Sequence, residues 1–296
     1  KGGMHTIEAG EVILCGGAIN SPQLLQLSGV GDPQELKRHG IDTVHELPGV
    51  GSNLQDHPDV LVIHRNRRRD TFTMGSWELP FTGAKAVWDF FTKRSGQLTS
   101  NVAEAGGFIK SRPEEERPDL QLHLTAAKLD NHGLNWMFSM GHGYSGHVCI
   151  LRPKSRGTIR LRDADPRSPA LIDPRFLEHP DDMEGMVRGV KAMRAIMAQD
   201  ALAPWRGEEL APGADVQSDE QIRAFLRRKC DNIYHPVGTC KMGVDDQAVV
   251  DPDLKVHGLE GLRVVDASIM PTLIGGNTNA PTVMIAEKAA DKILGV

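Results

Sequence analysis

The pattern of apolar and polar positions predicts a chain that alternates short strands, turns and helices. Residues 11–15 form an apolar run typical of a buried strand. A helix is expected over residues 21–27, with Pro22 in its first turn, where the missing N–H is tolerated. Asp32 and Glu35 form the pattern of a capping box at the start of the next helix. With 31 Gly and 18 Pro in the chain, we expect a fold rich in turns.

The middle of the chain has a different pattern, with alternating strands and longer amphipathic helices. Apolar residues recur at helical spacing over residues 182–198, and several of them are Met. Such a Met stripe fills a core far more often than it binds a cofactor. Ser218 is expected to cap the helix predicted over residues 218–229. The predicted strands cover residues 120–124, 146–151 and 158–161, and the predicted helices cover residues 81–93, 182–198 and 218–229.

The C-terminal part returns to strand, turn and helix. A strand is expected at residues 262–265, with Asp266 at its carboxyl end, and a helix at residues 280–294. A carboxylate at a strand end accepts hydrogen bonds from ligand hydroxyls, and the amino end of a helix favours negative charge. The alternative is an ordinary connection between a strand and a helix without a ligand.

Charge and length exclude some classes of protein. The 296 residues carry 34 Lys and Arg against 39 Asp and Glu, a net charge of −5, which argues against nucleic acid as a partner. The cluster at residues 65–69 is read as a solvated basic loop, with a polyanion or membrane-surface patch as the alternative. No apolar run approaches the roughly 18 residues of a membrane span. The length suits two domains or one large domain.

The four cysteines indicate a reducing compartment. They form no C-x-x-C pair and have no zinc-finger spacing to His, so we expect free thiols. The cytoplasm is the expected location, with peripheral attachment to the inner membrane as an alternative. Because position 1 is Lys, the chain is expected to begin inside a longer protein. No metal site is expected, since His132, His142 and His147 have no acidic or His partner at helical spacing.

One glycine motif matches a nucleotide-binding pattern without its context. Residues 141–146 read G-x-G-x-x-G, but the apolar run that follows predicts a strand rather than a helix. A phosphate loop needs a helix there, because helix N–H groups bind the anion. The motif is therefore interpreted as a glycine-rich bend between strands.

Two polar side chains in separate segments are candidates for chemistry. His235 lies between Tyr234 and Pro236 and is followed by small residues, a setting that suits a proton acceptor near neutral pH. The alternative is a buried, hydrogen-bonded structural His. Asn277 lies in a Gly- and Asn-rich loop and has an amide that can donate to an alcohol or alkoxide oxygen.

Six segments together resemble the glucose–methanol–choline (GMC) flavin oxidoreductases, in the branch of choline-dehydrogenase-like alcohol dehydrogenases. The likeness spans essentially the whole chain, in the family's order. It departs from the family in one respect, because the G-x-G-x-x-G motif and the acidic residue that hold FAD at the start of members are not found. The segments that carry the resemblance are residues 17–31, 49–57, 104–108, 152–157, 232–243 and 265–282.

The resemblance implies a mixed α/β fold and a set of site residues. It places part of an FAD-binding domain at residues 1–65 and 231–296, and a substrate domain with an antiparallel sheet flanked by helices at residues 66–230. It makes His235 the catalytic base and Asn277 the second polar group on the substrate oxygen. It also implies these flavin-lining residues: Tyr234, Asp266, Ala267, Asn277, Thr278, Asn279 and Ala280.

The implied activity is FAD-dependent oxidation of a primary alcohol to the aldehyde, by proton abstraction and hydride transfer to flavin N5. Choline and a neutral aliphatic or aromatic alcohol stay open as substrates. Glu104 is either the partner of a cationic substrate or a solvated carboxylate. The electron acceptor, whether oxygen, a quinone or a carrier protein, also stays open. The alternatives are a lyase on the same fold and a fragment that needs a separate N-terminal half to hold FAD.

Overall fold

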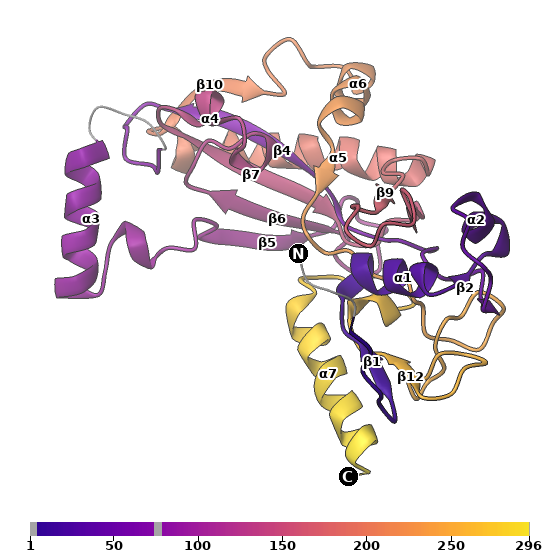
Figure 1. The fold of residues 1–296 in the computed structure, drawn as a ribbon. Coiled ribbons are helices and arrows are strands. Elements are labelled where there is room, and N and C mark those ends of the chain that lie inside the picture. The colour runs from indigo at the N-terminus through magenta and orange to yellow at the C-terminus, as the bar shows by residue number, and fades with distance from the viewer. Residues whose placement is uncertain (1–4, 74–78, 296) are drawn as a thin grey trace. The chain divides into compact units, whose positions relative to one another are not determined.

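The computed structural model describes residues 5–73 and 79–295, which fold into two compact units (Figure 1). The first unit takes the described residues of Lys1–His57, Arg152–Phe176 and Tyr234–Val296. The second takes those of Pro58–Leu151 and Leu177–Ile233. These units differ from the predicted domains at residues 58–65, 152–176 and 231–233. The domain assignment stays a prediction, because compactness alone does not say which segment binds a ligand.

The first unit joins strands that are far apart in the sequence. β1 (Val12–Leu14) and β12 (Leu262–Val264) form a parallel pair, as do β2 (Val30–Gly31) and β3 (His45–Glu46). Its apolar core lies between these segments and includes Leu25, Val250 and Val264. The remaining elements are α1 (Gly17–Leu27), α2 (Pro33–Arg38), β8 (Thr158–Arg160), β9 (Leu171–Asp173), a 3-10 turn (Ala267–Ile269) and α7 (Asn279–Leu294).

Two details of the first unit correct the sequence predictions. α1 begins at Gly17 rather than Ser21, so Pro22 lies inside the helix and not in its first turn. Because Pro has no N–H, it leaves the carbonyl of Ala18 without its helical partner, and the Thr239 hydroxyl donates to that oxygen at 2.6 Å. Asp32 does cap α2, but Glu35 pairs with Arg38 instead of completing a capping box.

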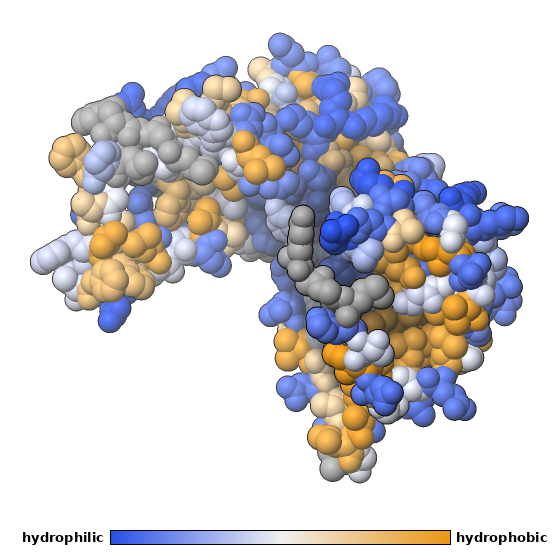
Figure 2. All heavy atoms as spheres, in the orientation of Figure 1, coloured by the Kyte–Doolittle hydropathy of each residue, from blue (hydrophilic) through white to orange (hydrophobic). Residues whose placement is uncertain are grey.

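The predicted strand at residues 11–15 forms as β1 but is not buried. Val12 and Ile13 are 50% and 41% exposed, which corrects the prediction. Val283 and Met284 of α7 are about as exposed, and Figure 2 shows hydrophobic residues towards the end of α7. Parallel strands are normally covered on both faces, so the two-stranded β1–β12 sheet has apolar surface that calls for a cover.

The second unit is built on an antiparallel sheet covered by helices on one face. The strand order is β10-β4-β7-β6-β5, and β11 pairs with the start of β4. The strand predicted after the G-x-G-x-x-G motif forms as β7, but it already begins at Gly143 inside the motif and follows helix α4, so the motif is not a bend between strands. The elements are β4 (Pro58–Asn66), α3 (Leu79–Lys93), β5 (Ala105–Ile109), β6 (Leu120–Thr125), α4 (Trp136–Ser139), β7 (Gly143–Ile150), α5 (Pro180–Met197), β10 (Arg206–Ala211), α6 (Asp219–Lys229) and β11 (Asp231–Asn232).

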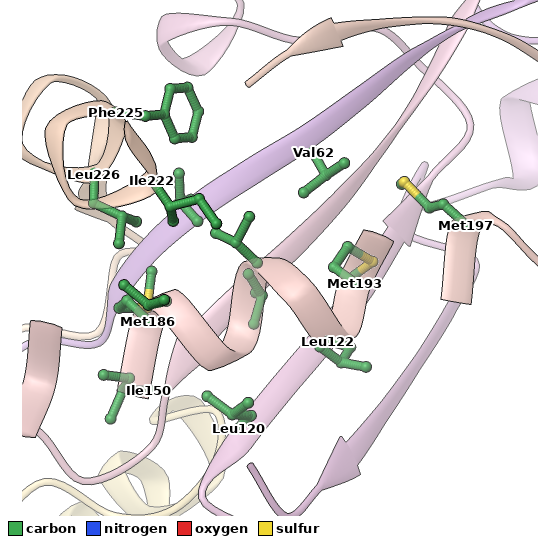
Figure 3. Close-up of a cluster of buried hydrophobic side chains, with 14 of the residues drawn as sticks. Val62, Leu120, Leu122, Ile150, Met186, Met193, Met197, Ile222, Phe225 and Leu226 are labelled. Carbon is green, nitrogen blue, oxygen red and sulfur yellow. The ribbon is translucent and has the colours of Figure 1, made fainter. Parts of the chain in front are cut away.

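The Met stripe of α5 fills the core of this unit, as predicted. Met186, Met193 and Met197 pack against β4, β6 and β7, and Ile222 of α6 completes the cluster (Figure 3). The capping box of Ser218 and Gln221 also forms at the start of α6. Alternation along the strands sends every second side chain into this cluster and the others to the opposite face.

That opposite face carries a polar pair, in which Asp59 is buried and His147 is partly buried. Nδ1 of His147 lies 2.7 Å from Oδ2 of Asp59, and His123 stands across the strand pair from His147. Burial lowers the pKa of His147, but the charge and hydrogen bond of Asp59 outweigh this effect and raise it. Burial raises the pKa of Asp59.

No helix among residues 5–73 and 79–295 is long and apolar enough to cross a membrane.

The Asp59–His147 pair makes stability depend on pH. Because the pKa of His147 is raised in the folded state, its contribution is present below the unfolded value of about 6.5 and is lost as pH rises through the folded value. His147→Gln should lower the free energy of unfolding by about 1–3 kcal/mol at pH 6 and by less at pH 9. Urea unfolding measures this difference, with the exposed His5→Gln as control. An equal loss at both pH values would contradict it.

Candidate active site

The segment Asn53–His57 runs beside the segment that carries His235. Gln55 and Val237 exchange two backbone hydrogen bonds, of 3.0 and 2.9 Å. Oδ1 of Asp56 accepts from the backbone N–H of His57 at 2.7 Å and from that of His235 at 3.0 Å. One buried carboxylate therefore fixes the backbones of both histidines.

His235 is buried at the end of a strained turn. Its side chain is only 8% exposed, whereas Tyr234 before it is 65% exposed and has a φ of +64°. A left-handed conformation is uncommon for Tyr and needs support from its surroundings. The hydrogen bond from the His235 N–H to Asp56 supplies such support directly after the turn.

The imidazole of His235 meets two partners, one at each ring nitrogen. Its Nδ1 lies 3.0 Å from Nδ1 of His57, and the two rings meet edge to face. Its Nε2 lies 3.3 Å from Nδ2 of Asn277. The structure therefore brings together the two residues that the sequence singled out, although they are 42 positions apart in the chain.

The loop that carries Asn277 is bound to the same segment of the chain. The carbonyl oxygen of Ile274 lies 3.1 Å from Nε2 of His57. The side chain of Gln55 accepts from the N–H of Leu273 and donates to the carbonyl of Pro271, at 3.1 and 3.2 Å. These contacts hold the loop so that its amide reaches His235.

Sequence reasoning assigned no role to Gln55, Asp56 or His57. Their signal was a run of polar residues inside a Gly- and Asn-rich stretch without secondary structure of its own. All three side chains are at least 93% buried, which is unusual for Gln, Asp and His. Arg152 was also missed, and its guanidinium lies directly against Gly275.

Asp266 is placed at the end of β12, as predicted, but protein groups already engage its carboxylate. Oδ2 accepts from the N–H of Gly17 at 2.9 Å and from the hydroxyl of Ser21 at 2.6 Å, and Oδ1 accepts from the N–H of Ser268. Asp266 thus joins the start of α1 to the turn that begins at Ala267. A role towards a ligand hydroxyl stays a prediction for Asp266 and Ala267.

The start of α7 presents polar and small residues to solvent. The helix begins at Asn279 after Thr278, and in the described residues no side chain caps this end. Asn277, Asn279 and Ala280 are exposed. The positive end of a 16-residue helix, with the N–H groups of Asn279 and Ala280 in its first turn, favours negative charge at this place.

Glu104 and the three histidines considered above as metal ligands, His132, His142 and His147, belong to the second unit. Glu104 is exposed just before β5. Within residues 5–73 and 79–295, no three His, Cys, Asp or Glu side chains are grouped so that they could hold a metal ion. Asn277, His235 and His57 are the polar groups whose geometry favours acid–base chemistry on a small molecule.

Known proteins resemble this chain over almost its full length. It is 50% identical to an alcohol dehydrogenase [acceptor] of Pseudomonas putida over 98% of the chain and 52% of the relative. It is 47% identical to the mitochondrial choline dehydrogenase of Homo sapiens, over 96% of the chain and 48% of the relative. A formate oxidase structure from Aspergillus oryzae has a TM-score of 0.84 at 28% identity, over 96% of the chain and 54% of that structure.

The chain spans about half the length of the curated relatives it matches. Two sequence profiles, each described as GMC oxidoreductase, match residues 1–59 and 153–286. The first ends just after His57, and the second contains His235 and Asn277. Since both profiles describe one family and match in their chain order, the chain belongs to the GMC oxidoreductase family.

Proposed function

We propose that this chain carries the alcohol-binding half of an FAD-dependent enzyme that oxidises a primary alcohol to the aldehyde. The observation that carries the proposal is the 3.3 Å contact between Nε2 of the buried His235 and Nδ2 of Asn277. The relatives named alcohol and choline dehydrogenases support the reaction class.

The residues around this pair fit the polar ring of a flavin. The exposed start of α7 offers N–H donors, and Asn277 and Asn279 offer amides that match ring carbonyl and nitrogen groups. The similar formate oxidase of Aspergillus oryzae was solved to study FAD modification, which supports the same cofactor. The residues proposed to hold it are Tyr234, Asp266, Ala267, Asn277, Thr278, Asn279 and Ala280. When bound, FAD supplies a hydride acceptor.

The protein groups divide the rest of the chemistry between them. His235 takes the hydroxyl proton at Nε2, so the electron pair of the O–H bond stays on oxygen and drives the loss of hydride from the carbinol carbon. Asn277 donates to that oxygen and holds it beside the base. The uncapped end of α7 favours the negative charge that the hydride brings with it.

We further propose that a polypeptide corresponding to the rest of the relatives covers the apolar side chains of β1. Val12 and Ile13 are exposed on a two-stranded parallel sheet, which is rarely stable alone. The match to about half of each relative supports the same partner. The substrate class and the electron acceptor are properties of the enzyme assembled from this chain and that partner polypeptide.

In the assembled enzyme, His235→Ala should slow flavin reduction by the alcohol about 10²–10⁴-fold, the range for loss of a general base. Asn277→Ala should slow it less, because a hydrogen bond and not the proton acceptor is lost. Anaerobic stopped-flow absorbance measures the rate, and flavin content controls for cofactor loss. Reduction at unchanged speed in His235→Ala would exclude the base assignment.

Glu104 provides a test between a cationic and a neutral alcohol. If its carboxylate pairs with a quaternary ammonium, Glu104→Gln lowers kcat/KM for choline about tenfold and leaves a linear or benzylic alcohol unchanged. Glu114→Gln, another exposed carboxylate of the same unit, serves as the control. A preference for neutral alcohols in the unaltered enzyme, with no effect of Glu104→Gln, would exclude the cation-binding role.

Co-expression tests the proposed partner. The chain and an N-terminal half from a relative should co-purify as a yellow complex, and Ile13→Asp should abolish co-purification because it places a charge in the apolar contact. Val44→Asp, at a side chain 71% exposed in the same unit, should not. Co-purification that survives Ile13→Asp would show that β1 is not the contact.

A further inference from the structure

His57 is a buried imidazole for which the proposed reaction gives no role. Its side chain has no exposed surface, yet each of its ring nitrogens has a polar neighbour. Nε2 faces the carbonyl oxygen of Ile274 at 3.1 Å, and Nδ1 faces Nδ1 of His235 at 3.0 Å. Both distances are those of ordinary hydrogen bonds.

The chemistry of these neighbours determines where the protons lie. A carbonyl oxygen only accepts, so the hydrogen bond to Ile274 requires a proton on Nε2 of His57. Complete burial disfavours the charged form of an imidazole, so we take the ring of His57 as neutral. A neutral imidazole carries one proton, and Nδ1 of His57 is therefore a hydrogen-bond acceptor.

The tautomer of His57 also determines where the proton of His235 lies. Since Nδ1 of His57 accepts, Nδ1 of His235 must donate the proton of their 3.0 Å hydrogen bond. Neutral His235 then has its lone pair on Nε2, the nitrogen that faces the amide nitrogen of Asn277 at 3.3 Å. An amide N–H donates, so this contact agrees with a bare Nε2.

We propose that His57 is a positioning residue that fixes the tautomer of His235, leaving Nε2 unprotonated and aimed at the alcohol. This inference rests on the proposed function of His235 as the base. Asp56 supports the arrangement, because its Oδ1 binds the backbone N–H groups of both histidines and keeps their rings together.

The neutral acceptor has a further consequence. A carboxylate in the place of His57 would add a negative charge beside the ring of His235 and favour its imidazolium form. An uncharged imidazole accepts the Nδ1 proton of His235 without adding that charge. The pair thus differs from the common arrangement in which a carboxylate orients a catalytic His.

Nitrogen NMR of the chain labelled with ¹⁵N-histidine tests the tautomer without cofactor or turnover. In the unaltered chain, Nε2 of His235 should appear as a bare ring nitrogen and Nδ1 as a protonated one. The His235→Asn spectrum assigns the signals. A proton on Nε2 of neutral His235 in the unaltered chain would overturn the proposal, whatever the variants do.

Two substitutions of His57 separate orientation from packing. Gln offers both a donor and an acceptor, so His57→Gln should keep the Nδ1–H tautomer of His235, whereas His57→Leu should move the proton to Nε2 or mix the two forms. The signals of His147, which Asp59 holds in the other unit, should stay the same and report correct folding. An unchanged His235 tautomer in His57→Leu would also overturn the proposal.

In the assembled enzyme, His57→Leu should slow flavin reduction about 10–100-fold, with His57→Gln within a few-fold of the unaltered rate. Equal rates in both variants and the unaltered enzyme would refute the positioning role. This failure is distinct from a failure of the proposed function, which shows as unchanged reduction in His235→Ala.

Discussion

The hydrogen bond between the two imidazoles is the constraint on which the candidate site depends. His57 and His235 come from segments that only the fold brings together, and the third segment, with Asn277, is bound through Ile274 to the same ring. One buried ring therefore has contacts with two polar segments. A small shift of either segment would break a hydrogen bond that water cannot replace there.

Close approach of the backbones makes this contact possible. A Cβ at Gly238 would lie 2.6 Å from the carbonyl oxygen of Asn53, and its φ of +92° suits only glycine. Asn53 in turn donates to the carbonyl of Gly238 at 3.1 Å. The small residues that follow His235 are thus explained by packing against residues 53–57, and the resulting rigidity orients the imidazole.

The elements predicted best from the sequence are those whose signal is local. The α5 Met stripe, the Ser218 capping box and strands β6 and β7 follow from periodicity and from side chains within one turn of each other. Pro22 was misjudged because its compensation comes from Thr239, more than 200 positions away. Local patterns cannot indicate such a partner.

The candidate site is likewise predicted only where its residues have an unusual local sequence. His235 and Asn277 could be proposed because their own surroundings are unusual, in a turn before Pro and in a Gly- and Asn-rich loop. The importance of His57 arises only from what it touches, and neither neighbour is close to it in the chain. A polar residue whose role depends on burial is invisible until the fold shows that it is buried.

The exposure of β1 also could not be predicted from its local sequence. Its apolar sequence is typical of a strand covered on both faces, yet Val12 and Ile13 face solvent beside a single parallel partner. The site histidines, by contrast, contact each other, Ile274 and Asn277, which all belong to the first unit. The histidine pair can therefore be preorganised in the chain itself, while the surface of β1 is left for a second polypeptide segment to cover.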